Sequence, residues 1–321
     1  IVDSIFVSRI NEYALRAVSL AFPIQSLMIA VAVGTAVGIN AFLSRTLGEK
    51  DFEKANIIAR NGIFIAIASY IGFAVVGALI SRPFFASQTE VLEVREYGVT
   101  YLTICCVAGM GIFLQTTFER LLQATGKTMY TMITQSTGAI INIILDPILI
   151  FGYFGMPRMG IAGAAVATVI GQIVPLVMYI VWHRKKGLGV SIHIKDMKPD
   201  PAICGRLYAV GIPSSLTLGM PSLLITLLNK IAGAFSSVYV LVLGVYFKLQ
   251  TFLYLPASGI VQGMRPILSF NYGAGEKKRM KQILSVCTGL IFGILTVGTA
   301  LFLLLPEPIM DCLLYTSPSP R

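Results

Sequence analysis

The stretch AVSLAFPIQSLMIAVAVGTAVGINAFLS, residues 17 to 44, decides the fold class, because it contains no charged side chain. An α-helix needs about 20 apolar residues to cross the roughly 30 Å hydrocarbon core of a bilayer, so this stretch predicts a membrane-spanning helix. The rest of the chain agrees, since 55% of its 321 residues are hydrophobic, only 12% are charged and the mean hydropathy is +0.79. Such a composition is typical of an integral membrane protein.

Further apolar windows follow along the chain. The uncharged ones are residues 61 to 81, 97 to 118, 128 to 145, 159 to 182, 207 to 229 and 282 to 306. One more apolar segment, about 237 to 264, is interrupted only by Lys248. With the first stretch, these windows predict an all-α integral membrane protein with eight complete spans. Residues 1 to 8 form part of a further span that precedes them.

The chain also contains an internal repeat at an offset of 225 residues. FPIQSL at 22 to 27 corresponds to FKLQTF at 247 to 252, and the segments 38 to 55 and 263 to 280 share Gly, Ser and Gly in the same register. Two matches in one register favour the duplication of a bundle of about six helices, as in many transporters. The repeat therefore predicts two lobes.

These observations predict how the chain is divided. An N-terminal lobe covers residues 1–182, a basic cytoplasmic linker covers 183–205, and a partial C-terminal lobe covers 206–311. We expect the chain to be truncated at both ends. Residues 312–321 resemble translated cloning sequence, so we expect a non-native tail there.

Basic residues indicate the orientation in the membrane. Most Lys and Arg residues fall in the loops that follow the first, third, fifth and seventh complete spans, including Arg45, Lys54, Arg120 and Arg206. The positive-inside rule makes that side cytoplasmic, so topology explains the net charge of +10. A nucleic-acid surface would need one continuous basic face with aromatic residues. We therefore predict a lipid bilayer, and no nucleic acid, as a partner.

Asp146 stands before a proline in the apolar stretch INIILDPILIFG, residues 141 to 152. A charged side chain at the bilayer centre costs at least about 2.5 to 3.5 kcal/mol, so we expect Asp146 to face the bundle interior. Asn142 lies one turn earlier on the same helix face, and Pro147 leaves the carbonyl of Ile143 without its helical donor. Oxygen ligands suit a small cation, and a buried carboxylate can instead carry a proton. Alternatively, Asp146 and Asn142 only satisfy polar groups around the kink.

Several motifs resemble those of the multidrug and toxin extrusion (MATE) exporters. They are IVDSIFVSRI from residue 1, LSRTLGEKDFEKA from 43, NIILDPILIFG from 142, GIAGAAVATVIGQ from 160 and LPASGIVQGMRPILSFNYGAGEKKR from 255. The resemblance implies a two-lobed bundle with twelve spans in its full form, which exports organic cations in exchange for Na⁺ or H⁺. It also implies a cation-coupling site in the first lobe, formed by Asp3, Asn142, Asp146 and Thr168. Threonines commonly bond back to their own helix, which is the alternative for Thr168.

Four further polar residues are candidates for the substrate cavity: Gln25, Asn229, Lys248 and Gln250. Lys248 lies near the middle of its span, so we expect it to pair with an acid or line a water-filled cavity. Snorkelling to the interface is the alternative. The glutamines, which are equivalent in the repeat, serve equally well as structural hydrogen-bonding groups. Small residues in GTAVG (34 to 38) and GIAGAAVATVIG (160 to 171) predict close helix packing.

The main hypothesis is a monomeric secondary antiporter of the cell membrane that exports small organic cations by alternating access. It uses Na⁺ or H⁺ as coupling ion and no cofactor, and Na⁺ is a candidate ligand of Asp146. In a Gram-negative bacterium it would lie in the inner membrane. The sequence has no serine nucleophile motif, paired catalytic carboxylates or ATP site, which argues against an enzyme. The alternatives are a lipid-linked oligosaccharide flippase of the same superfamily, and a channel or scaffold.

Overall fold

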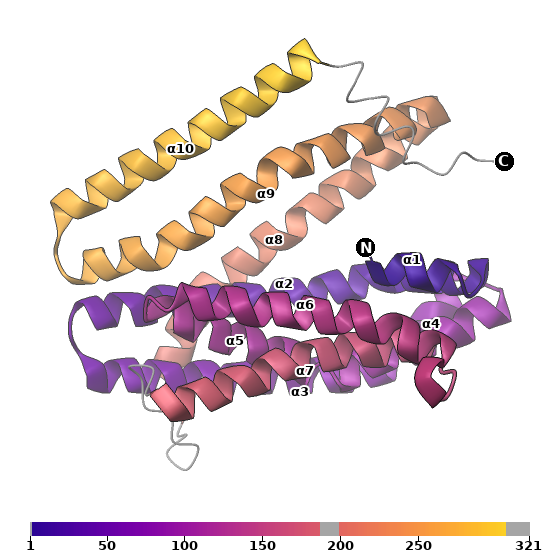
Figure 1. Ribbon diagram of the computed structural model, residues 1–321, viewed down its shortest axis with the longest axis horizontal. Coiled ribbons are helices and arrows are strands. Elements are labelled where there is room, and N and C mark those ends of the chain that lie inside the picture. Colours follow the sequence, from indigo (N-terminus) through magenta and orange to yellow (C-terminus); the bar gives the residue numbers. More distant parts are fainter. Residues whose placement is uncertain (1, 187–198, 306–321) are drawn as a thin grey trace. The chain divides into compact units, whose positions relative to one another are not determined.

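The computed structural model describes residues 2–186 and 199–305, and every element in these ranges is a helix (Figure 1). The predicted all-α fold is therefore confirmed. The elements are α1 (Val2–Ser8), α2 (Glu12–Gly48), α3 (Phe52–Gln88), α4 (Leu92–Val107), α5 (Met110–Ala124), α6 (Thr128–Phe151), the 3-10 helix η1 (Tyr153–Gly155), α7 (Ile161–Lys186), α8 (Pro201–Phe235), α9 (Ser237–Gly273) and α10 (Lys277–Leu304). The predicted tail at 312–321 and most of the predicted linker lie outside the described residues.

Helix ends follow local signals in the sequence. The side chain of Asn11 accepts a hydrogen bond from the backbone N–H of Ala14 at 2.7 Å, and Asp51 accepts one from the N–H of Lys54 at 3.0 Å. These bonds satisfy donors that the first turns of α2 and α3 leave open. At the other end of α6, Gly152 has φ +79°, a left-handed conformation that glycine adopts without strain. Short polar or glycine-containing turns therefore separate long helices.

Helices cover each predicted span, with one difference in geometry. By length and composition α2, α3, α6, α7 and α10 are able to cross a membrane. The window 97 to 118, predicted as one span, is a pair of helices, α4 and α5, bent by 41°. α8 and α9 are 35 and 37 residues long and contain the other two predicted spans. Several of their side chains lie outside the described set.

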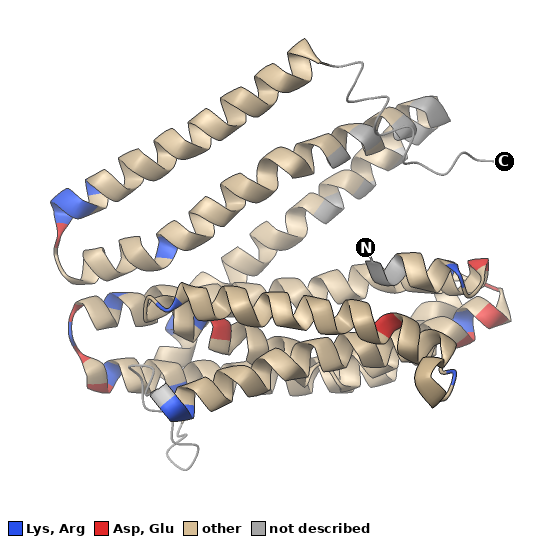
Figure 2. Ribbon diagram, in the orientation of Figure 1, with Lys and Arg blue, Asp and Glu red and all other residues tan. Residues whose placement is uncertain are grey.

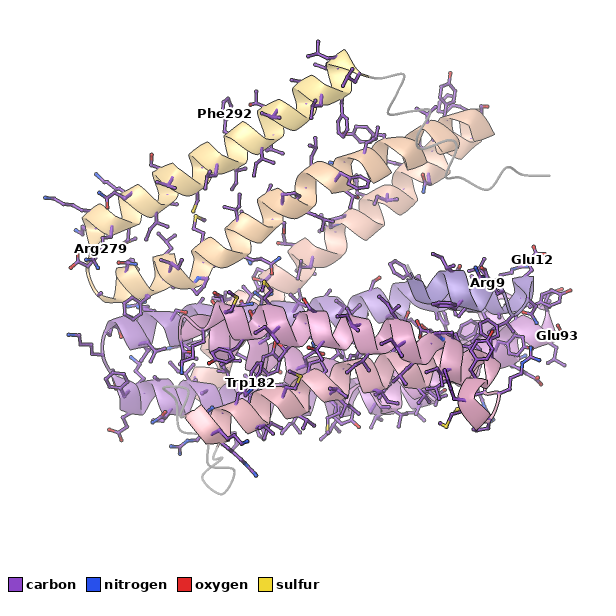
Figure 3. The ribbon with its side chains drawn as sticks, in the orientation of Figure 1. Arg9, Glu12, Glu93, Trp182, Arg279 and Phe292 are labelled. Carbon is purple, nitrogen blue, oxygen red and sulfur yellow. The ribbon has the colours of Figure 1, made fainter. Side chains whose placement is uncertain are left out.

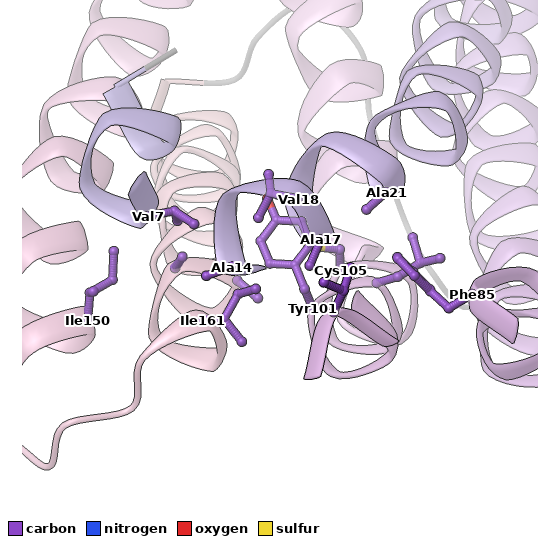
Figure 4. Packing of buried hydrophobic residues seen from close by; sticks show 14 of the residues in the cluster. Val7, Ala14, Ala17, Val18, Ala21, Phe85, Tyr101, Cys105, Ile150 and Ile161 are labelled. Atoms are coloured by element: carbon purple, nitrogen blue, oxygen red, sulfur yellow. The ribbon is translucent and has the colours of Figure 1, made fainter. Parts of the chain in front are cut away.

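By its internal contacts the chain divides into two units, residues 1–219 and 220–321. In the first unit, a buried cluster joins α1, α2, α4, α6 and α7, with Val7, Ala17, Tyr101, Ile150 and Ile161 among its members (Figure 4). In the second unit α9 packs against α10, where Gly298 lies against Leu253. The predicted lobe boundaries stay a prediction.

Glycines allow helix backbones to touch at both predicted packing motifs. A Cβ atom at Gly38 in α2 would lie 2.5 Å from the carbonyl oxygen of Leu207 in α8. A Cβ atom at Gly163 in α7 would lie 2.5 Å from the carbonyl oxygen of Leu149 in α6. Real Cβ atoms do not approach so closely, so only glycine fits either position without movement. The close packing predicted from these motifs is confirmed.

Charged side chains lie mainly at the two ends of the first unit. Arg9, Glu12 and Glu93 lie at one end (Figure 3), and the α2–α3 loop, which carries both acidic and basic residues, lies at the other (Figure 2). Which of the two ends is cytoplasmic stays a prediction from the sequence.

The predicted loop positions of four basic residues are corrected, because helices extend past their apolar windows and include Arg45 (α2), Lys54 (α3), Arg120 (α5) and Arg206 (α8). Arg45, Lys54 and Arg206 are still exposed, whereas Arg120 is only 6% exposed.

Hydrogen bonds explain why Arg120 can be buried. Its Nη1 donates to Oε1 of Gln123 at 2.8 Å, and its carbonyl oxygen accepts from Nδ2 of Asn40 at 3.0 Å. The neighbouring Glu119 accepts from Gln123 at 2.9 Å and from Gln135 at 2.6 Å. Burial of charged groups is tolerated when such partners satisfy them. α5 therefore extends beyond its apolar window.

The buried hydroxyl of Tyr179 in α7 hydrogen-bonds with Thr134 in α6. Tyr179→Phe is expected to lower the free energy of unfolding by about 0.6 to 1.7 kcal/mol, because it removes an interhelical hydrogen bond. Unfolding in detergent, followed by circular dichroism, measures the change. In the Tyr179→Phe background, Thr134→Val should lower the free energy of unfolding by less than it does in the wild type, because the hydrogen bond is already gone. Equal decreases in the two backgrounds would contradict coupling between Tyr179 and Thr134.

Candidate functional site

Asp146 lies inside the first unit, and its side chain is 0% exposed. Asn142, one turn earlier in α6, donates from Nδ2 to Oδ1 of Asp146 at 3.3 Å. The expected inward orientation of Asp146 is thus observed, and Asn142 meets it through the amide nitrogen rather than through the expected amide oxygen. A carboxyl group in this position is removed from lipid and from bulk water, so its charge state depends on the few polar groups and ions that reach it.

The backbone of α7 lies in close contact with the side of α6 that carries Asn142. A Cβ atom at Gly138 would lie 2.5 Å from the carbonyl oxygen of Gly171, and one at Gly171 would lie 3.1 Å from Cβ of Asn142. Gly138, Asn142 and Leu149 lie along one side of α6, and Leu149 contacts Gly163. Tight packing between α6 and α7 therefore sets the position of Asn142. Because Asn142 bonds to Asp146, the same packing fixes the geometry of this hydrogen-bonded pair.

Pro147 follows Asp146 within α6, which continues without a break to Phe151. Proline has no N–H, so it cannot donate to the carbonyl of Ile143. The predicted set of a carboxylate, an amide oxygen and a backbone carbonyl thus lies within about one turn of α6. These are hard oxygen donors, which fit a small cation such as Na⁺. The same carboxylate can alternatively take up a proton.

Two other residues of the predicted coupling site are less fully defined. Thr168 is half-buried in α7 and donates from Oγ1 to the carbonyl oxygen of Ala164 at 3.0 Å. This is the back-bonding that the sequence left open as the alternative, and the hydroxyl oxygen can still accept a bond or bind a cation. Asp3 belongs to α1, which packs against α2 and α6, but its side chain lies outside the described residues.

The substrate-cavity candidates fall in both units. Gln25 is half-buried and donates from Nε2 to the hydroxyl of Tyr101 at 3.3 Å and to Sγ of Cys105 at 3.5 Å, so it links α2 to α4. In the second unit Asn229 is half-buried and Gln250 is exposed. The side chain of Lys248 lies outside the described residues. A cavity shared by these four residues stays a prediction.

The polar cluster around Glu119, Arg120, Gln123 and Gln135 was not singled out from the sequence. The available signal was the spacing of Glu119 and Gln123, which places both on one helix face. Among the residues that the structure describes, no three His, Cys, Asp or Glu side chains come together as a metal site of that kind.

Comparison with known proteins places the chain in a family. The profile of the MatE family matches residues 1–148 and 213–318, which together make up most of the sequence. The chain belongs to the MatE family. Members of this family are transporters and not enzymes, in agreement with the absence of catalytic motifs from the sequence.

Named relatives of this MatE chain are multidrug exporters. It is 28% identical over 292 residues to the multidrug export protein MepA of Staphylococcus aureus (strain MSSA476). The aligned region covers 88% of this chain and 62% of that relative. It is also 28% identical over 280 residues to MepA of Staphylococcus haemolyticus, covering 86% of the chain and 60% of the relative. The chain therefore spans less than two thirds of the length of these proteins.

Solved structures share the fold. A crystal structure of MATE in complex with MaD5 superimposes with a TM-score of 0.90 at 23% identity, covering 98% of this MatE chain and 71% of that one. A MOP superfamily transporter from Pyrococcus furiosus superimposes with a TM-score of 0.85 at 24% identity, covering 99% and 70%. The MATE-type fold expected from the sequence is confirmed.

Proposed function

We propose that the complete protein is a secondary active antiporter, which exports small organic cations in exchange for Na⁺ or H⁺ across the cell membrane. The observation that carries this proposal is the fully buried carboxyl group of Asp146, which accepts a hydrogen bond from Asn142. Membership of a transporter family and the relatives named multidrug export protein support it. We further propose that the protein acts as a monomer and needs no cofactor.

The coupling step follows from the electrostatics of this carboxyl group. Ionised Asp146 is costly in its buried position unless a cation offsets the charge. Na⁺ would be held by the carboxylate, the Asn142 amide oxygen and the Ile143 carbonyl, whereas H⁺ would neutralise the carboxylate directly. Thr168 and Asp3 are the proposed additional oxygen donors. In either case, binding of the coupling cation changes the net charge of the site.

That change in charge biases the packing around α6. A cation affects a conformational equilibrium only if it binds the two conformations with different affinity. We propose that the Asp146 site binds its cation more tightly in the conformation that faces the outside. The two lobes would then rock about a central cavity lined by Gln25, Asn229, Lys248 and Gln250. Release of the cation inside would restore the drug-binding conformation.

Transport by reconstituted protein tests this proposal. The complete protein is placed in liposomes, and movement of a fluorescent organic cation such as ethidium is followed under a Na⁺ gradient and, separately, under a pH gradient. We expect uphill movement under one of the two gradients and none in liposomes without protein.

The other outcomes identify other functions. Movement of a labelled anionic lipid-linked sugar without ethidium transport would favour the flippase. Ethidium movement that only equalises concentrations, whichever gradient is imposed, would favour a channel. Either result would overturn the antiporter proposal.

A further inference from the structure

A cavity of about 100 Å³ lies where the end of α2, the beginning of α3 and the beginning of α8 meet. Its lining residues include Arg45 and Lys54 on either side of the α2–α3 loop, and that loop lies at the end of the first unit that is predicted to be cytoplasmic (Figure 2). The lining residues are Phe42, Arg45, Thr46, Glu49, Lys54, Ile58, Ile203, Arg206 and Leu207. None of them belongs to the coupling site around Asp146.

The lining carries an excess of positive charge. It contains three cationic side chains, Arg45, Lys54 and Arg206, but only one carboxylate, Glu49. Arg45 donates from Nε to Oε1 of Glu49 at 2.9 Å, and this pair is partly exposed, with 49% and 31% of the two side chains accessible. Because Glu49 offsets only one of the three cations, the cavity is complementary to an anion.

Most of the other lining residues are apolar. Ile58 and Leu207 are buried, and Phe42 and Ile203 pack against the same hydrophobic cluster. A small hydrated anion gains nothing from this surface, because apolar side chains offer it no hydrogen bond. A molecule with a charged group beside hydrocarbon can use both parts. The lining therefore fits an amphiphilic anion better than free phosphate.

Contacts outside the cavity hold the walls in place. Asn61 in α3 accepts a hydrogen bond at 2.8 Å from the backbone N–H of Asp200, which in turn caps the beginning of α8. Gly38 allows α2 to lie against the backbone of α8 at Leu207. The backbone positions of Lys54 and Arg206 are therefore set by packed helices, so no backbone segment has to be ordered on binding.

We propose that this cavity binds the phosphate headgroup of an anionic phospholipid from the cytoplasmic leaflet. Basic pockets between helices on the cytoplasmic side suit such headgroups, and that leaflet carries a negative surface potential. Arg45, Lys54 and Arg206 contact the phosphate, and the partly exposed Phe42 and Ile203 contact the adjoining glycerol and acyl carbons. The lipid bridges α2, α3 and α8 and stabilises their packing.

Native mass spectrometry of the full chain in detergent tests the site, with phosphatidylglycerol and phosphatidylcholine added in turn. We expect one phosphatidylglycerol to bind in preference to phosphatidylcholine. The double variant Lys54→Gln with Arg206→Gln should bind phosphatidylglycerol roughly 30-fold more weakly, at about 1 kcal/mol for each lost cation. Both positions are exposed, so we expect the variant to fold, and circular dichroism checks this.

A matched control removes the same charge elsewhere. The control variant is Lys278→Gln with Arg279→Gln. Both residues are in the first turn of α10, which is predicted to be on the same side of the membrane but does not line the cavity. This control should retain wild-type affinity. An equal loss of phosphatidylglycerol affinity in both double variants would overturn the proposed site, and so would equal binding of phosphatidylglycerol and phosphatidylcholine. Displacement of the lipid by inorganic phosphate at comparable concentration would overturn its assignment to a lipid.

Discussion

Asp146→Asn is expected to lower gradient-driven drug efflux by roughly 30-fold or more, since removing one member of a buried charge interaction costs about 2 to 5 kcal/mol. Asparagine has nearly the same shape and can still bond to Asn142, so the bundle should fold. It can neither carry a proton nor offset the charge of Na⁺. The measurement is the rate of ethidium efflux from preloaded cells that express the complete protein, corrected for its abundance in the membrane.

Glu53→Gln provides the control for this variant. Glu53 is an exposed acid in the first turn of α3, so its replacement removes one negative charge without touching the coupling site. Efflux by this control should equal that of the wild type. Wild-type efflux by Asp146→Asn at equal abundance would show that the buried carboxylate does not couple transport.

Gly138→Ala should destabilise the protein by about 1 to 3 kcal/mol, the usual cost of overpacking. The added methyl group would lie 2.5 Å from the carbonyl oxygen of Gly171 and 2.7 Å from Cγ of Pro175. Neither is the end of a flexible side chain, so α7 must move away from α6. Because Gly171 also contacts Asn142, efflux should fall together with stability. Thermal unfolding in detergent and ethidium efflux measure the two effects.

Gly72→Ala is the matched substitution. Gly72 lies in α3 with no atom within 4 Å of an added Cβ, so the change should raise stability by about 0.5 to 1 kcal/mol through helix propensity. Opposite signs for the two variants would identify the α6–α7 contact as the cause. Equal effects of both variants would contradict the close approach seen at Gly138.

Local spacing made part of this architecture predictable. Asn142 and Asp146 are four residues apart on one helix, so their contact follows from helical geometry. The small residues at Gly34, Gly38, Gly163 and Gly171 likewise recur at four- and eight-residue intervals, which predicted close helix packing but not the partner helices, α8 and α6. Helix existence was predictable because hydrocarbon leaves a spanning segment few alternatives.

Features that depend on distant residues were not predictable. The burial of Arg120 depends on its bond to Gln123 and on a contact with Asn40, 80 residues earlier. The chain has no proline between Val107 and Met110, where α4 and α5 meet, so the sequence contains no sign of the bend between them. The basic cavity combines Arg45 and Lys54 with Arg206, from beyond the predicted linker. A single sequence does not tell which of many basic loop residues meet.

Cation binding by the purified complete protein tests the central proposal most directly. Equilibrium binding of radioactive Na⁺, and proton uptake in weak buffer, are measured side by side for the wild type and Asp146→Asn. We predict that the wild type binds one of these two cations and that the variant loses this binding while remaining folded. Equal binding of the same cation by the folded variant would contradict the assignment of the coupling site to Asp146.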